Sequence, residues 1–463
     1  MLYDLSFLQT GAAWPPPSEK QRLDDYKAHR DLFSGKHAEV YRAQFRRVER
    51  ITGLDGAHIS YPIILNYHRL ISLKMADLVF AEQPKITVSE DSAQKTLDKI
   101  LTETDLLNRA YSAAIDVSRY GDAVLALSLA DKDVLSVDGS SPDRWFPVVD
   151  KGNIQKRLYD VQAWHYCADP KREDYELRVV IHAPGQTEEL RYALRKGGGD
   201  SFVIGRELER RSESTGLSAS ALSTAHNVLT TDSIFGVSDY EIIDSVLWEI
   251  MIRVTQISKV LDAHSSPSMS GPDSALENPD GVWVFKAGNY FPRASSDEPP
   301  LEYITWDASL EANFKQIEFL LHQLYSLSEM GSAIFGDLKT STGAIPSGTA
   351  LRRLMMSPLA KASRVKNSFD RALKRLLESA LSLRGIQTQV SIAWKDGLPD
   401  DEAEQAQIAA TRTGSKATLS QWSAIQRLDD LSDADTRTEL DMIRADEEMS
   451  TGIGLAEPGP DDT

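Results

Sequence analysis

The feature that most constrains the fold is a run of 27 residues, SDYEIIDSVLWEIMIRVTQISKVLDAH, at positions 238–264. Ser238 and Glu241 match the pattern of a capping box, which predicts that a helix begins here. Across 242–252 apolar side chains almost encircle this helix, so it needs neighbours on every side. Charged residues such as Asp244 interrupt the run and exclude a lipid bilayer as that neighbour.

Two further long helices are predicted after the first. Apolar periodicity indicates one over 307–330 and another over 347–384, with a kink at Pro358 and an end at Gly385. The segment 265–306, between the first two helices, is rich in Pro, Gly and aromatic residues and is too short for a core of its own. The pattern therefore predicts two long helices joined by a small β-containing excursion.

The N-terminal half alternates helix and strand signals. Residues 19–52 predict one or two polar helices interrupted at Ser34-Gly35, and a helix beginning near residue 66 is stopped by Pro84 before a short strand. A single helix is predicted over 94–118, and short strands over 145–230. The expected fold class is α+β, mainly helical.

Composition indicates a globular chain in a reducing compartment. At 463 residues and 41% apolar content, two to four domains with real cores are expected. The single cysteine, Cys167, excludes an intramolecular disulfide and is expected to be a small buried residue. Neither a leader peptide nor a run of about 18 apolar residues is present, so no membrane association is expected.

Charge is segregated along the chain. The net charge of −18 argues against a general nucleic-acid coat. Between Arg352 and Arg375 there are eight basic residues against one acid, whereas residues 396–463 hold 17 acids against five basic residues. The basic helix could carry subunit contacts, face DNA or be an ordinary solvated face.

The stretch GSAIFGDLKTSTGAIPSGTALRRL, at 331–354, contains a loop of some 16 residues between two predicted helices. Its glycines do not have the spacing of a phosphate-binding P-loop, and an apolar helix rather than a strand precedes it. Connections of this length in compact domains are usually functional or disordered. Composition alone leaves the role of the loop open.

No arrangement of residues typical of an enzyme is found. His165 and His182 fall on neighbouring predicted strands, but without a third ligand a cross-strand polar pair is the better reading than a metal site. No nucleophile elbow is recognisable, and the acidic residues are scattered. We expect no catalytic residue, cofactor or metal.

The order of several motifs along nearly the whole chain resembles the portal (head-to-tail connector) proteins of tailed double-stranded DNA bacteriophages. The stretches that carry the resemblance are NYHRLISLKMADLVFAEQP at 66–84, YGDAVL at 120–125, FGVSDYEIIDSVL at 235–247, HSSPSMSGP at 264–272, SGTALRRL at 347–354, and Leu398-Pro399-Asp400 before an acidic helix pair. Their order and separation are more specific than any one of them.

The resemblance implies a portal fold with named parts. These are a wing at 1–235 and 348–400, stem helices at 236–264 and 307–330, a clip at 265–306, a tunnel loop at 331–347, and a crown with a disordered tail at 401–463. It also assigns residues to roles. Asp337, Lys339, Thr340, Ser341 and Thr342 would face DNA in the tunnel loop; Ile243, Leu247, Trp248, Ile250, Phe314 and Leu320 would make stem contacts between subunits; Phe285, Tyr290 and Phe291 would serve docking at the clip.

The implied function is a channel for packaging and ejecting DNA. A homo-oligomeric ring, typically of twelve subunits, would sit at one capsid vertex of the virion after assembly in the host cytoplasm. Implied partners are double-stranded DNA passing without sequence specificity, the large terminase subunit, a head-to-tail adaptor, and the major capsid and scaffolding proteins. With Lys339 as its single basic residue, the loop at 331–347 would contact sliding DNA weakly.

Two alternatives to a portal ring stay open at this point. They are a monomeric structural or adaptor protein of the capsid and, less favoured, a DNA-processing enzyme.

Overall fold

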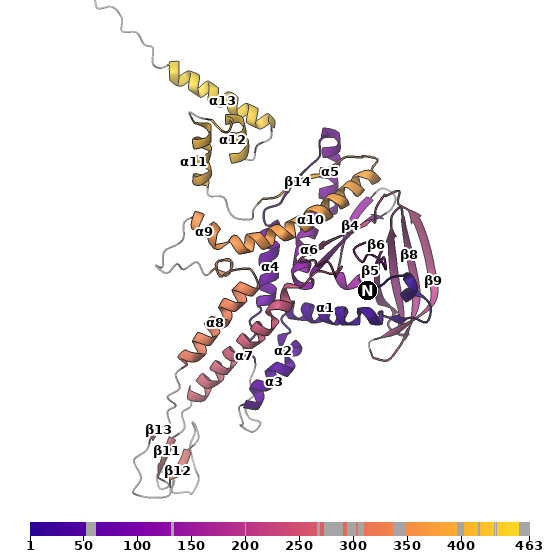
Figure 1. Cartoon of the computed structure of the whole chain (residues 1–463), viewed down its shortest axis with the longest axis vertical. Helices are drawn as coiled ribbons and strands as arrows, with labels where there is room; N and C mark the ends of the chain where they lie inside the picture. Colours follow the sequence, from indigo (N-terminus) through magenta and orange to yellow (C-terminus); the bar gives the residue numbers. More distant parts are fainter. Residues whose placement is uncertain are drawn as a thin grey trace, which may run out of the picture. The chain divides into compact units, whose positions relative to one another are not determined.

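The computed structural model in Figure 1 describes the following parts of the chain. They are residues 1–51, 62–130, 134–199, 201–265, 269–272, 290–293, 302–303, 310–336, 348–395, 402–414, 417–429, 431 and 433–452. These residues form two compact units, Met1–Gly397 and Leu398–Thr463. Helices and strands are mixed, which confirms the α+β class. Among the described helices, none is long and apolar enough to cross a membrane.

A six-stranded antiparallel sheet forms one layer of the first unit (Figure 1). In order across the sheet its strands are β1 (Ala13–Trp14), β9 (Phe202–Ser214), β8 (Gln186–Lys196), β7 (Asp174–Ala183), β6 (Arg157–Asp169) and β5 (Trp145–Val149). Because side chains alternate between faces, Leu177, Val179 and Ile181 enter one hydrophobic core. On the other face charged residues pair across strands, as Arg178 does with Glu189 at 2.6 Å.

The strands predicted over 145–230 are confirmed, and two of them reach 13 residues. Cys167 on β6 is exposed, so the expectation of a buried residue is wrong. The reason is that Cys167 lies near the end of a long strand whose last residues extend beyond the core.

A second, three-stranded sheet has the order β10-β3-β4, with β10 at Leu222–His226, β3 at Asp122–Ala130 and β4 at Val134–Ser140. Helices pack around it and against one another. They are α4 (Tyr67–Phe80), α5 (Asp91–Thr104), α6 (Leu106–Tyr120) and α10 (Met356–Leu383). A two-stranded antiparallel sheet joins β2 (Lys85–Thr87) to β14 (Ser391–Ala393).

The single helix predicted over 94–118 is wrong in one respect. The chain forms two helices, α5 and α6, because Asp105 between them adopts a left-handed backbone with φ of 49°. Aspartate tolerates this conformation better than most residues. Apolar periodicity continues on both sides of the break, and for that reason it did not reveal the break.

Two glycines allow the turn after α6 to approach the start of the next long helix. Gly121 has φ of +87°, and a Cβ at this position would overlap the backbone of Gly236. A Cβ at Gly236 would overlap the backbone of Gly121 in return. Only glycine fits at either position, since the two main chains are already in contact.

The predicted break at Ser34-Gly35 is confirmed, and Gly35 has φ of +88°. The helices around it are α1 (Lys20–Phe33), α2 (His37–Val40) and α3 (Arg42–Ile51). Short 3-10 turns occupy Leu5–Leu8, Pro17–Glu19, Pro142–Arg144 and Ala333–Phe335.

The two long helices predicted around the excursion are confirmed as α7 (Asp239–Ser265) and α8 (Glu311–Leu327), which pack side by side (Figure 1). Between them in sequence lies a small sheet. Its order is β12-β11-β13, with β11 at Met269–Pro272, β12 at Tyr290–Arg293 and β13 at Glu302–Tyr303.

The third long helix is broken where a proline predicted a kink. α9 (Gly348–Leu354) ends at Met355, and α10 begins directly after it, with Pro358 in its first turn. A proline is tolerated there because the first turn lacks intrahelical acceptors for its N–H groups. The predicted end also holds, since Gly385 follows α10 with φ of +79°.

The second unit consists of three helices in its described part. These are α11 (Glu402–Thr413), α12 (Gln421–Leu428) and α13 (Asp433–Gly452). Ala424, Ile425 and Leu440 are buried between them, and Ser420 caps α12 by accepting a hydrogen bond from the N–H of Ser423. The helices predicted for this tail are confirmed, and α11 and α13 are acidic, whereas α12 contains no acidic residue.

Candidate functional site

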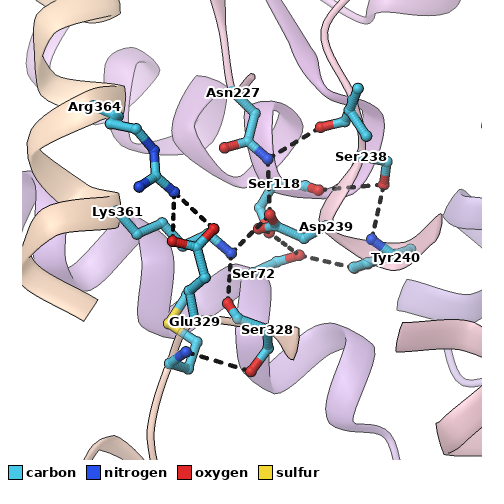
Figure 2. Close-up of polar contacts among 12 residues, drawn as sticks. Ser72, Ser118, Asn227, Ser238, Asp239, Tyr240, Ser328, Glu329, Lys361 and Arg364 are labelled. Atoms are coloured by element: carbon cyan, nitrogen blue, oxygen red, sulfur yellow. Dashed lines mark hydrogen bonds and ion pairs between the residues drawn. The ribbon is translucent and has the colours of Figure 1, made fainter. Parts of the chain in front are cut away.

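A buried ion pair lies where both long helices meet α10, just before the expected tunnel loop. Lys361 of α10 is 3% exposed, and its Nζ lies 2.8 Å from Oδ1 of Asp239, the first residue of α7. The same ammonium donates to the carbonyl oxygen of Ser328, directly after α8, at 2.8 Å (Figure 2). One side chain therefore fastens the beginning of α7 and the end of α8 to α10.

Other polar groups complete the environment of Asp239. Its Oδ2 accepts from the hydroxyl of Ser118 at 2.7 Å, and its Oδ1 accepts from the amide of Asn227 at 2.7 Å (Figure 2). The carboxylate also lies at the N-terminus of α7, where the helix dipole favours negative charge. A buried pair with this many partners is costly to break, since either partner alone would be an uncompensated buried charge.

The start of α7 is capped as its sequence predicts. The hydroxyl of Ser238 accepts from the N–H of Tyr240 at 3.1 Å and donates to the carbonyl of Arg119 at 2.7 Å. The Tyr240 hydroxyl lies 2.8 Å from Ser72 Oγ of α4. The cap therefore also joins α7 to α6 and α4 (Figure 2).

The first residues of the loop pack onto neighbouring helices. The ring of Phe335 stacks on Tyr325 of α8 at 5.3 Å between centroids and meets Tyr67 of α4 edge-on at 5.9 Å. Glu329 has φ of +58° and pairs with Arg364 at 2.7 Å (Figure 2). This second pair is exposed, so solvent screening leaves it little energy. The described base of the loop is therefore held by the ring contacts of Phe335 and by the hydrogen bond from Lys361 to Ser328.

A cluster of histidines lies along the buried side of α7. His68 is fully buried, with Nε2 2.7 Å from Asp244 Oδ1 and Nδ1 3.1 Å from His37 Nε2. Tyr41 donates to the same Asp244 oxygen at 2.9 Å. Burial, followed by the charge of His68, lowers the pKa of His37 to about 4. The cluster holds α2 and α4 against α7 in the neutral state of His37.

The two histidines weighed as a metal pair do not meet. His182 Nε2 lies 2.9 Å from Gln162 Oε1, and the ring of His165 packs on Phe202 at 4.9 Å between centroids. In the described part of the chain, no group of three His, Cys, Asp or Glu residues could hold a metal ion.

The residues expected at the stem divide into two groups. Ile243, Leu247 and Ile250 are at most 1% exposed, so they belong to the core of the single chain and keep no surface for another subunit. Trp248 and Leu320 are half-buried, whereas Phe314 is 51% exposed. The reason for the division is that α7 is covered by α3, α4, α6 and α8 of its own chain.

The residues expected at the tunnel loop, Asp337, Lys339, Thr340, Ser341 and Thr342, lie outside the described residues, as does Phe285 of the clip. Tyr290 and Phe291 fall on β12, which pairs in parallel with β11. The structure therefore describes the base of this loop and three short strands within the expected clip.

The basic helix is only partly a surface feature. Lys361 and Lys366 are buried, and Lys366 donates to the carbonyl of Lys395 at 2.6 Å. These two lysines therefore do not contribute to a surface that could contact another subunit, DNA or solvent, as was expected for this helix. A signal for Lys361 was present, because it precedes Val365 and Phe369 of the apolar stripe by four and eight positions.

Comparison with known proteins gives a family. Residues 19–181 and 268–452 match the family described as phage portal protein, SPP1 Gp6-like. No curated protein matches the chain.

Three solved structures are similar at low identity. They are the neck of an empty gene transfer agent (GTA) particle computed with C6 symmetry (14% identity, 78% of this chain and 89% of that chain, TM-score 0.45), the neck of a native GTA particle computed with C12 symmetry (13%, 78% and 89%, 0.43), and the virion of a native GTA particle (14%, 91% and 96%, 0.44). The family match spans most of the sequence, and the chain therefore belongs to the SPP1 Gp6-like family of phage portal proteins.

Proposed function

We propose that the chain assembles into a closed ring of identical subunits at one vertex of a phage or phage-like capsid, with α7 and α8 in the channel wall. The observation that carries this proposal is the surface of α8, where Phe314, Phe319 and Leu327 are 51%, 61% and 42% exposed. Large exposed apolar side chains on one element favour an interface. In a closed ring, each subunit covers this surface of its neighbour.

We further infer that double-stranded DNA passes through the ring without sequence specificity and that the loop at 331–347 contacts it. Asp337, Lys339, Thr340, Ser341 and Thr342 are the residues expected to face DNA. A loop with one basic residue binds phosphates weakly, as sliding requires. Lys361 supports this role, because it fixes the end of α8 from which the loop departs.

Docking of a packaging motor and later of an adaptor is assigned to the clip at 265–306. Phe285, Tyr290 and Phe291 are the proposed contact residues. The large terminase subunit, the adaptor, and the major capsid and scaffolding proteins are the proposed partners. Twelve subunits is the proposed number, and no catalysis is part of the proposal.

The experiment that tests the ring is the mass of the purified chain by native mass spectrometry, followed by negative-stain imaging. A closed ring of 51.4 kDa chains with a central hole is the expected result. A chain that stays monomeric at high concentration and also in the presence of its capsid proteins would contradict it. Metal-dependent cleavage of DNA by the purified chain would instead favour an enzyme.

The role of the loop is tested separately by shortening it across 337–345. Assembly should be unchanged, because the loop base is held by α4, α8 and α10. Packaging or retention of the genome should fall. Normal packaging with the short loop would remove the proposed DNA contact and leave the ring intact.

A further inference from the structure

A cleft of about 290 Å³ opens in the first unit between α10, β10 and the beginning of β6, away from the loop base. Three arginines line it: Arg157 from β6, and Arg371 and Arg375 from α10. No acidic side chain is among the described residues of its lining. The cleft is therefore strongly positive within an otherwise acidic chain of net charge −18.

Two carboxylates that contact the cleft lining, Asp160 and Asp122, already have hydrogen-bond partners. Asp160 is 2% exposed, and its Oδ1 accepts from Arg157 at 3.0 Å and from the indole N–H of Trp145 at 3.1 Å. Asp122 is fully buried and lies 2.6 Å from Nδ1 of His226. These contacts compensate Arg157 and leave Arg371 and Arg375 without a counter-charge among the residues that the structure describes.

Three donors of α10 point to the same ligand. Ser368, Arg371 and Arg375 stand three and four positions apart, so they share one face of the helix. Arg371 and Arg375 have no ion pair with any residue in the described ranges, and the buried Nε of Arg375 has no hydrogen-bond acceptor there. Ser368 is 8% exposed and accepts from the N–H of His226 at 2.8 Å, which leaves its own proton free to donate.

A buried donor without an acceptor is rare in folded proteins and calls for an explanation. Burial lowers the pKa of Arg375, the charge of Arg157 lowers it further, and Asp160 opposes both. A desolvated guanidinium next to a second one is stabilised by an anion that accepts from both.

We propose that this cleft binds one phosphate-class oxyanion, held by Ser368, Arg371 and Arg375 with Arg157 opposite. Planar guanidinium groups match the oxygens of a phosphate and bind it through two parallel hydrogen bonds. The volume admits such an ion together with several waters, each of which occupies about 30 Å³ in the liquid. The bound ion joins α10 to the sheet, and this role does not depend on ring formation.

The test is calorimetric titration of the full chain with inorganic phosphate, against sodium chloride at equal ionic strength, with a short DNA duplex as a second ligand. The main variant is Arg371→Gln, because Arg371 is exposed and its replacement leaves the core intact. The matched control is Lys374→Gln, which removes the same charge from the same helix outside the cleft lining. A second variant, Arg375→Gln, tests the buried donor.

Phosphate is expected to bind the wild type and the control alike, and Arg371→Gln should weaken it about tenfold or more, since a charge-assisted hydrogen bond is lost. Binding of the duplex alone, sensitive to Arg371→Gln and not to Lys374→Gln, would identify a DNA phosphodiester as the oxyanion. Absence of binding by either ligand, or an equal loss in the control, would overturn the proposal. If Arg375→Gln does not fold, the exposed variant decides the outcome by itself.

Discussion

Helices α7 and α8 are both rich in apolar residues, but the chain buries α7 and leaves much of α8 exposed. On α7, Ile243, Leu247 and Ile250 are at most 1% exposed. On α8, which the structure describes in full, Leu324 is the one buried residue, and Phe319 is 61% exposed. Apolar content therefore does not say whether a helix is covered by its own chain or left for another molecule.

The difference follows from the position of each helix. The first half of α7 is surrounded by other helices of the first unit, where the ion pair with Lys361, the Ser238 cap and the histidine cluster hold it. α8 packs against α7, and just past its C-terminal end the carbonyl of Ser328 accepts a hydrogen bond from Lys361 of α10. We infer that burial of α7 stabilises the folded chain, whereas burial of α8 would stabilise the proposed ring.

The largest effect is expected from a charge in the buried part of α7. Ile250→Asp should lower the free energy of unfolding by about 5 kcal/mol or more, because it buries an unpaired charge. Ile242→Asp on the same helix is the matched control, since Ile242 is 50% exposed. Chemical denaturation of both variants measures the difference. Equal stability of the two variants would break the comparison.

Loss of the buried ion pair should come next. Lys361→Met removes the partner of Asp239 and should cost about 3–5 kcal/mol. Arg364→Met, one turn further along α10, removes only the exposed pair with Glu329 and should cost less than about 1 kcal/mol. Urea denaturation distinguishes them. A Lys361→Met chain as stable as Arg364→Met would show that the junction does not anchor α7.

A smaller effect is expected from pH through the histidine cluster. The folded-state pKa of His37 is about 4, below its usual value, so the unfolded chain binds more protons between pH 4 and pH 6.5. Stability should therefore fall as the pH drops through this window, by about 1.4 kcal/mol per pH unit for this group. Thermal unfolding across the window measures it. His37→Gln should make the decline shallower, and an unchanged slope would exclude His37 as its source.

The smallest effect on folding, and the sharpest on assembly, is expected on α8. Phe319→Ser should change the free energy of unfolding by less than about 0.5 kcal/mol, because the ring is already exposed. Light scattering should nevertheless show loss of the large assembly. Leu324→Ser, at the buried position, should instead destabilise the chain by a few kcal/mol. Normal assembly by Phe319→Ser would place the subunit contact elsewhere.

The sequence predicted most elements, because the signals for them are local. Caps, prolines and glycines indicated the beginning of α7, the break before α10 and the end at Gly385. The break at Asp105 was not predicted, because a left-handed aspartate leaves no pattern in the apolar periodicity. The family, too, could be recognised from the order of motifs, since that order is a property of the chain itself.

The polar contacts were harder to predict from the sequence. Lys361 belongs to a basic run that the sequence presents as one surface, although the lysine is buried. Arg371 and Arg375 belong to the same run and line a cleft instead. Basic residues of one helix thus lie in two different environments, a buried ion pair and an open cleft, because different elements pack against each face of the helix.

The sequence by itself determined most helices and strands and the order in which they follow, because capping, periodicity and turn residues act over a few positions. Only the tertiary structure decided which apolar side chains the chain covers itself, that Lys361 meets Asp239, and that Arg371 and Arg375 have no counter-charge among the described residues. The physical reason is that burial and electrostatic compensation depend on residues far apart in the sequence, which only packing brings together.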